Sequence, residues 1–137
     1  MVVLGGCAPR IAEIYPVAPA GARCYALAYT PVEADGLFPA LIALEPGDSG
    51  GGAVWLPTPI DSLGIWRMFQ RPTRWEVLTD DSLVVSFHNG FSGALLRLFR
   101  SATGTLLAGN ASWTSDVVGP DLPRASLTGQ ETPCPAP

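Results

Sequence analysis

Glycine and proline interrupt this chain at short intervals from end to end, and they limit the length of any regular element. The 137 residues include 15 glycines and 14 prolines. Both residues weaken helix interiors and favour turns. The segments between them are short runs in which apolar and polar residues alternate with a period of two, as in half-buried strands. The sequence therefore predicts an all-β protein made of many short strands joined by tight turns.

Composition indicates one globular domain and excludes several classes of function. Hydrophobic residues make up 47% of the chain and charged residues 15%, which is enough for a packed core. No window reaches the roughly 18 consecutive apolar residues of a membrane-spanning helix. The net charge is −4, and the basic residues are eight scattered arginines. Nucleic-acid binding needs a clustered basic surface, so we expect no nucleic-acid partner.

The clearest local signal is a hairpin in the second half of the chain. In the segment "SLVVSFHNGFSGALLRLFR", Asn89-Gly90 separates two alternating runs, and both residues tolerate the positive φ of a tight hairpin turn. About eight short strands at this spacing favour a single antiparallel β-barrel, with a β-sandwich as the alternative. The expected strands span residues 24–30, 37–44, 52–56, 63–69, 73–78, 82–88, 93–100, 105–112 and 124–130.

Several of these runs support a family resemblance. The stretches "DSLVVSF", "LLRLF" and "TLLAGNASW" resemble the later strands of small lipocalin-like barrels and of uncharacterised small secreted bacterial proteins. The resemblance implies a closed barrel and brings no catalytic residues with it.

The N-terminal segment carries a second resemblance. Leu4-Gly5-Gly6-Cys7 is similar to the lipobox of bacterial lipoproteins, in which the cysteine becomes the acylated first residue of the mature protein. The resemblance implies a lipid anchor on Cys7 in the bacterial cell envelope, a Pro/Ala-rich tether over 8–22 and a barrel domain over 23–137. Only residues 1–6 precede Cys7, fewer than a signal peptide needs. The alternative is therefore an unmodified thiol.

The two remaining cysteines predict a disulfide. Cys24 lies at the start of the first expected strand, and Cys134 lies just after the last one. A bridge between them would close a loop of about 110 residues and stabilise the fold by on the order of 4–5 kcal/mol in the chain-entropy model. Such a bridge persists in oxidising compartments. The alternative is a pair of unrelated buried thiols.

The segment "GDSGG" around Ser49 raises the possibility of a serine hydrolase. It resembles the nucleophile loop of trypsin-like proteases and fits the G-x-S-x-G pattern of α/β-hydrolases. The trypsin-like mechanism needs a histidine before the serine, and the one histidine, His88, follows it. The hydrolase elbow needs a helix after the serine, which the glycines and prolines over 50–59 prevent. We therefore expect a turn at Ser49, a non-enzymatic protein, and no metal or cofactor.

Aromatic residues are the remaining candidates for a binding role. Small barrels either fill their interior with such side chains or enclose one small apolar ligand. If a ligand cavity exists, strand alternation makes Trp66, Trp75, Phe87 and Phe99 candidates for its walls. The first hypothesis is therefore a monomeric envelope protein that binds a small apolar molecule and touches the membrane only through its lipid anchor.

A second hypothesis is that the barrel docks an envelope protein. Small disulfide-closed bacterial barrels that inhibit proteases or lysozyme are the precedent, and their loops make the contact. The corresponding loops here are the glycine loop 47–52 and the hairpin tip 89–91. A serine hydrolase that uses Ser49 is the remote third hypothesis.

Overall fold

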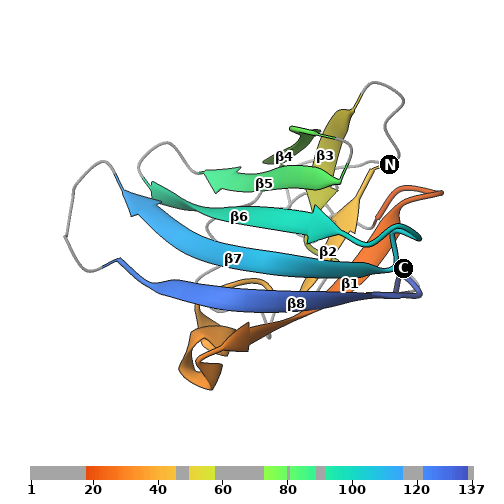
Figure 1. Ribbon diagram of the computed structural model, residues 1–137. Coiled ribbons are helices and arrows are strands. Elements are labelled where there is room, and N and C mark those ends of the chain that lie inside the picture. Colours follow the sequence, from red (N-terminus) through yellow and green to blue (C-terminus); the bar gives the residue numbers. More distant parts are fainter. Residues whose placement is uncertain are drawn as a thin grey trace, which may run out of the picture.

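The chain forms a closed barrel of eight antiparallel strands (Figure 1). A computed structural model describes residues 18–45, 50–57, 73–79, 81–88, 92–115 and 122–135. The predicted fold class is confirmed, and the barrel is consistent with the lipocalin-like resemblance. The strands are β1 (Arg23–Thr30), β2 (Leu41–Leu44), β3 (Gly51–Trp55), β4 (Thr73–Val77), β5 (Ser82–His88), β6 (Ser92–Arg100), β7 (Leu106–Ser115) and β8 (Arg124–Thr132).

Each strand pairs with its neighbours in sequence, and β8 closes the barrel on β1. This closing register runs from Cys24 opposite Thr132 to Thr30 opposite Ser126. Closure leaves no unpaired strand edge, which is how barrels avoid edge-to-edge association. The longest pairing joins β6 to β7, and with β5 and β8 these strands form the broad wall that faces the viewer in Figure 1.

Alternation along the strands sends one set of side chains into the barrel. In β8, Ala125, Leu127 and Gly129 are buried and the residues between them are exposed. The same period of two places Leu96 and Leu98 of β6 inside. One hydrophobic cluster fills the interior, and its members include Tyr25, Tyr29, Phe38, Ile42, Trp75, Leu83, Phe87, Leu96 and Leu98.

The connection between β1 and β2 covers one end of the barrel. The sequence predicts a strand over 37–44, but β2 begins only at Leu41, after a 3-10 helix, η2 (Val32–Gly36). Phe38 turns inward and stacks on Tyr29, with ring centroids 5.2 Å apart. The Tyr29 hydroxyl donates to the carbonyl oxygen of Pro39 at 2.6 Å, and the Trp113 indole N–H donates to that of Leu37 at 2.7 Å. These contacts to the barrel hold residues 37–39 out of the strand pairing.

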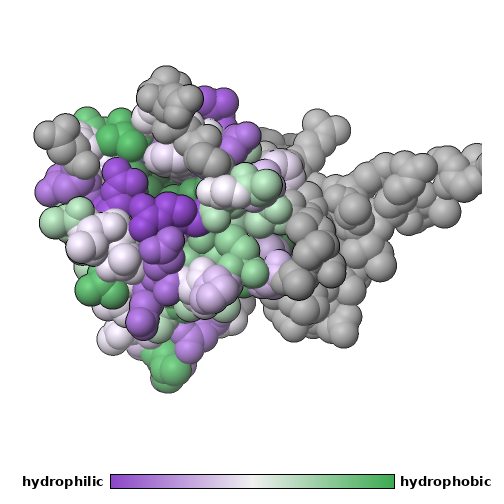
Figure 2. Space-filling model, turned by 90° about the vertical axis from the view of Figure 1, so that its right-hand side faces the viewer, coloured by the Kyte–Doolittle hydropathy of each residue, from purple (hydrophilic) through white to green (hydrophobic). Residues whose placement is uncertain are grey.

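The opposite end is held by polar contacts around the turn between β6 and β7. The Tyr25 hydroxyl donates to the carbonyl oxygen of Gly104 at 2.7 Å. Arg23 donates to the same oxygen and to both carboxylate oxygens of Glu131, at 2.9 and 2.8 Å. This bidentate pair lowers the pKa of the Glu131 carboxyl from its ordinary value. Figure 2 looks onto this end and shows a band of hydrophilic residues, in purple, crossing it.

The predicted disulfide is confirmed. Cys24 and Cys134 are bonded, with Cα atoms 5.2 Å apart and a separation of 110 positions in sequence. The bond ties the start of β1 to the segment that follows β8, beside the Arg23–Glu131 pair. It therefore fixes the two ends of the barrel wall to each other at the place where the barrel closes.

Other expectations fall on parts of the chain that the structure does not describe. These are the strand over 63–69, most of the tether over 8–22, and the hairpin turn at Asn89-Gly90. In the described part of the chain, no helix is long and apolar enough to cross a membrane.

Candidate functional site

The four aromatic residues proposed as cavity walls have different locations. Trp75 and Phe87 lie inside the barrel, with 6% and 2% of their surface exposed. Phe99 is 58% exposed and points away from the interior, so the expectation that alternation places it inside is wrong. Leu98, the residue before Phe99, faces the interior, so strand alternation turns the Phe99 side chain to the outer face. Trp66 lies outside the described residues.

The interior around Trp75 is tightly packed. The indole lies across from Gly52, its pairing partner on β3. A Cβ atom on Gly52 would lie 3.0 Å from the Trp75 Nε1 and 3.3 Å from a carboxylate oxygen of Glu45. That carboxylate accepts the N–H of Ala53 at 2.9 Å. The buried Trp75 Nε1 has no hydrogen-bond partner in the described part of the chain, which makes it a place for an ordered water or a ligand acceptor.

The outer wall of the barrel carries a surface hollow. Ala28, Thr128, Ala108 and Phe99 are successive pairing partners across β1, β8, β7 and β6, so their side chains share one row on the outer face. The first three are small and the fourth is large. The outer surface therefore rises from the small side chain of Ala108 to the large side chain of Phe99.

The neighbouring row also ends in a large apolar side chain. Ala26 and Gln130 are partners, and Gln130 is in turn paired with Leu106, which is 52% exposed. Together the two rows form a groove of about 770 Å³, called here the outer groove. A second hollow of about 520 Å³ continues it toward the disulfide and shares Leu106 and Gln130. The residues that line the outer groove are Ala26, Leu27, Ala28, Phe99, Arg100, Ser101, Leu106, Leu107, Ala108, Thr128, Gly129 and Gln130.

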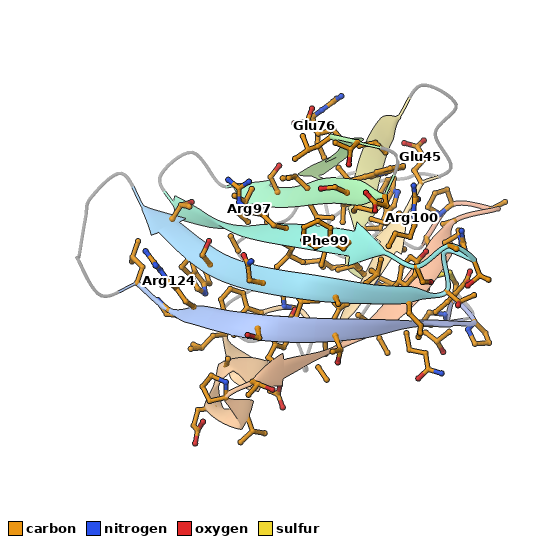
Figure 3. The ribbon with its side chains drawn as sticks, viewed as in Figure 1. Glu45, Glu76, Arg97, Phe99, Arg100 and Arg124 are labelled. Atoms are coloured by element: carbon orange, nitrogen blue, oxygen red, sulfur yellow. A yellow bond between two sulfur atoms is a disulfide. The ribbon has the colours of Figure 1, made fainter. Side chains whose placement is uncertain are left out.

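Two arginines of β6 lie near the outer groove, and strand alternation places them on opposite faces of that strand. Arg100 lines the groove, and none of the described residues that line it is acidic. Arg97 lies two residues before Phe99 on the same face of β6 and is exposed. Figure 3 shows Phe99 on β6 between Arg97 and Arg100. Neither arginine side chain has a hydrogen bond or ion pair with any residue that the structure describes.

The described residues hold no arrangement for catalysis or metal binding that the sequence suggested. Ser49 and Cys7 lie outside the described residues, and His88 is the last residue of β5. Within the described ranges, no group of three or more histidine, cysteine, aspartate or glutamate side chains is placed to hold a metal ion. The glycine loop 47–52 is described only over 50–52, so loop contacts with a partner stay a prediction.

The fold and the outer groove define the class of protein: a disulfide-closed, eight-stranded antiparallel barrel with an apolar groove on its outer wall. Comparisons with protein-family models, with curated proteins and with solved structures give no match.

The outer groove was not predicted from the sequence, in which the candidate binding residues were large aromatic residues expected to face inward. The available signal was the opposite one. The outward positions of β1 and β7 carry alanines where a solvent-facing strand normally has polar residues, namely Ala26, Ala28 and Ala108.

Proposed function

We propose that this protein is a non-enzymatic binding protein of the cell envelope or exterior, and that it docks another protein on the outer groove. The observation that carries the proposal is the exposure of two large apolar side chains, Phe99 and Leu106, beside a floor of alanines. Exposed apolar surface of this kind marks interaction sites in soluble proteins.

The shape of the groove supports a protein partner over a small molecule. Small ligands bind in clefts that cover 70–90% of their surface (typical range). The outer groove lies on the convex wall of a barrel, and the large exposed apolar side chains at its rim, among the described residues, are Phe99 and Leu106, so one side of any occupant stays uncovered. A partner protein covers that side with its own surface.

The disulfide supports the proposed location. Cystine bridges form and persist outside the reducing cytosol, and the Cys24–Cys134 bond closes the barrel. We further propose that the protein carries a lipid anchor on Cys7. Mass spectrometry of the protein from its own cells tests it, since acylation adds the mass of a diacylglyceryl group and a further acyl chain at Cys7.

Site-specific photo-crosslinking tests the docking function. A benzophenone amino acid replaces Phe99 in one variant and Arg74 in a control, because Arg74 is exposed on the outer face of β4, away from the groove. We expect one discrete heteromeric adduct at position 99 and none at position 74. Adding Ala108→Trp, which fills the groove, abolishes the adduct. Equal adducts at both positions, or none at position 99, contradict the proposal.

A second candidate function is carriage of a small molecule inside the barrel. The buried Trp75 Nε1, which lacks a partner in the described part of the chain, favours it as a donor to a ligand. The packed hydrophobic cluster around Trp75 and Phe87 fills the interior, so carriage of a small molecule is the weaker candidate. Native mass spectrometry of the protein from its own cells distinguishes the two candidate functions. A carrier retains a non-covalent ligand, and Trp75→Phe should weaken the binding of that ligand.

A further inference from the structure

We infer that a second copy of this chain covers the outer groove when no other protein is bound, with Phe99 of each copy packed on the alanine floor of the other. The inference rests on the proposed docking surface and names an occupant for it, in place of the monomer expected from the sequence. Three observations carry it: the order of large and small side chains across the wall, the absence of charged side chains in the two outward rows of the groove, and the area of the wall.

The order of side chains across the wall makes the groove complementary to itself. A symmetric dimer pairs one surface with its own copy, so that surface must hold both a projecting side chain and the place that receives it. Across β6, β7, β8 and β1 the outward row reads Phe99, Ala108, Thr128 and Ala28. A two-fold axis that runs parallel to the strands between β7 and β8 exchanges β6 with β1. Phe99 of each copy then faces Ala28 of the other.

The same axis also pairs the neighbouring row. Leu106 of β7 and Gln130 of β8 are pairing partners on the two sides of the axis, so Leu106 of each copy faces Gln130 of the other. Packed sheets lie about 10 Å apart with their strands nearly aligned. A large side chain opposite a small one fills this space, whereas two facing phenylalanines would hold the sheets apart. The arrangement therefore covers Phe99, which is 58% exposed in the single chain.

The centre of the wall carries no charge that would oppose its own copy. In a symmetric contact, a central charge meets the same sign on the other copy. The outward residues of the two groove rows, from Ala26 to Leu106 and from Ala28 to Phe99, are all uncharged. Among the described outward positions of these four strands, the charged residues are Arg97 and Arg124, one and two rows from the row of Phe99. Both lie toward the rim, where interfaces are polar and hydrated.

The area of the wall matches a weak dimer. The strands β1, β6, β7 and β8 are eight to ten residues long and neighbour one another across the wall (Figure 1). At about 4.8 Å between strands and 3.4 Å per residue, the wall measures roughly 19 Å by 30 Å. Two such faces give roughly 1,200 Å², the lower limit for specific interfaces. We therefore expect a Kd of about micromolar or weaker, which leaves the groove open to displacement by a protein partner.

Sedimentation of the purified full-length chain tests the dimer. Phe99→Ser removes the projecting side chain, Ala108→Trp fills the groove, and Leu106→Ser changes the neighbouring row. Leu78→Ser is the matched control, because Leu78 and Leu106 are both 52% exposed and Leu78 follows β4, outside the wall. Circular dichroism checks the fold of each variant. The three wall variants should raise the dimer Kd by about tenfold or more, and Leu78→Ser by less than about twofold.

Photo-crosslinking tests the symmetry of the contact. A benzophenone amino acid replaces Phe99, and unlabelled and isotopically labelled copies of this variant are mixed in equal amounts with no other protein present. We expect an adduct of twice the chain mass, in which peptides of mixed isotopic label join position 99 to β1 near Ala28. This adduct differs in mass from the heteromeric one that the docking function predicts.

Failure of the dimer and failure of the docking function are distinguishable. A wild-type chain that stays monomeric up to about 1 mM overturns the inference, since an interface of this size should be occupied there. A dimer that Phe99→Ser and Ala108→Trp leave unchanged, or crosslinks from position 99 to strands other than β1 and β8, also overturns it. None of these results affects the heteromeric adduct, and loss of that adduct alone refutes the docking function.

Discussion

Phe99 lies directly opposite Ala108 in the pairing of β6 with β7, and the difference in size between these two side chains creates the wall of the outer groove. Both residues are exposed, so neither contributes much to the hydrophobic core. Binding and folding are therefore separable at this position, and the groove can be altered without loss of the barrel.

Phe99→Ser and Ala108→Trp should leave stability nearly unchanged while they abolish docking. Exposed substitutions away from special features alter the free energy of unfolding by about 0.5 kcal/mol or less. Loss of an aromatic anchor from an interface costs about 2 kcal/mol or more of binding free energy, which is over tenfold in Kd. Urea unfolding measures the stability, and titration with the protein partner captured by crosslinking measures the Kd. A large loss of stability in Phe99→Ser would show that Phe99 supports the fold.

The fold was predictable because its signals are local. Alternation along the strands and the turn residues between them define the strands, and β5 spans the residues expected for it. The cysteine positions led to the correct disulfide for the same reason, since they flank the strand region on both sides. The prediction was wrong for the first half of 37–44, where Phe38 packs against Tyr29 across the barrel end. That contact is tertiary and leaves no periodic signal in the sequence.

The outer groove was not predictable because it depends on register between four strands. Ala28 and Phe99 lie 71 positions apart in sequence and share a row only through the pairings of β1 with β8, β8 with β7 and β7 with β6. Alternation alone also leaves the inward face of a strand undetermined when both faces carry apolar residues. In β6 the sequence "LLRLF" offers Leu95 and Phe99 on one face and Leu96 and Leu98 on the other.

Removal of the disulfide should destabilise the barrel strongly. Replacing both Cys24 and Cys134 by alanine frees a loop of 110 residues, which the chain-entropy model values at about 4–5 kcal/mol. The free energy of unfolding of the double variant, measured in urea, should equal that of the wild type measured in the presence of reductant. Unfolding that is unaffected by reductant would show that strand pairing alone closes the barrel.

Two interior glycines should tolerate no side chain. A Cβ atom on Gly129 would lie 2.7 Å from a methyl carbon of Leu27, and one on Gly109 would overlap the carbonyl oxygen of Arg97. Overpacking typically costs about 1–3 kcal/mol, and we expect Gly109→Ala to cost more than Gly129→Ala because its neighbour is backbone. Gly36→Ala is the matched control, since no atom lies within 4 Å of its Cβ position. Thermal unfolding ranks the three variants.

The Arg23–Glu131 pair should make stability depend on acidic pH. The hydrogen bonds from Arg23 lower the folded-state pKa of Glu131 below its ordinary 4.5. The stabilisation is therefore present above pH 4.5 and is lost as the pH falls through the lower, folded value. Glu131→Gln should flatten the stability profile below pH 4.5, and Arg23→Gln should flatten it equally. A profile in which only one of the two variants differs from the wild type would contradict the pairing.

Tyr29 should control stability at alkaline pH. Burial raises its folded-state pKa above the ordinary value of 10.0, so the phenol stays protonated in the barrel and ionises in the unfolded chain. Its stabilisation is complete below pH 10 and is lost as the pH rises above that value, by about 1.4 kcal/mol per pH unit. Tyr29→Phe removes the donor to the Pro39 carbonyl and costs about 1–3 kcal/mol at neutral pH. The free energy of unfolding of Tyr29→Phe, measured in urea, should decline less steeply above pH 10 than that of the wild type, so the two curves converge. Parallel curves would show that the pKa of Tyr29 is the same in the folded and unfolded states.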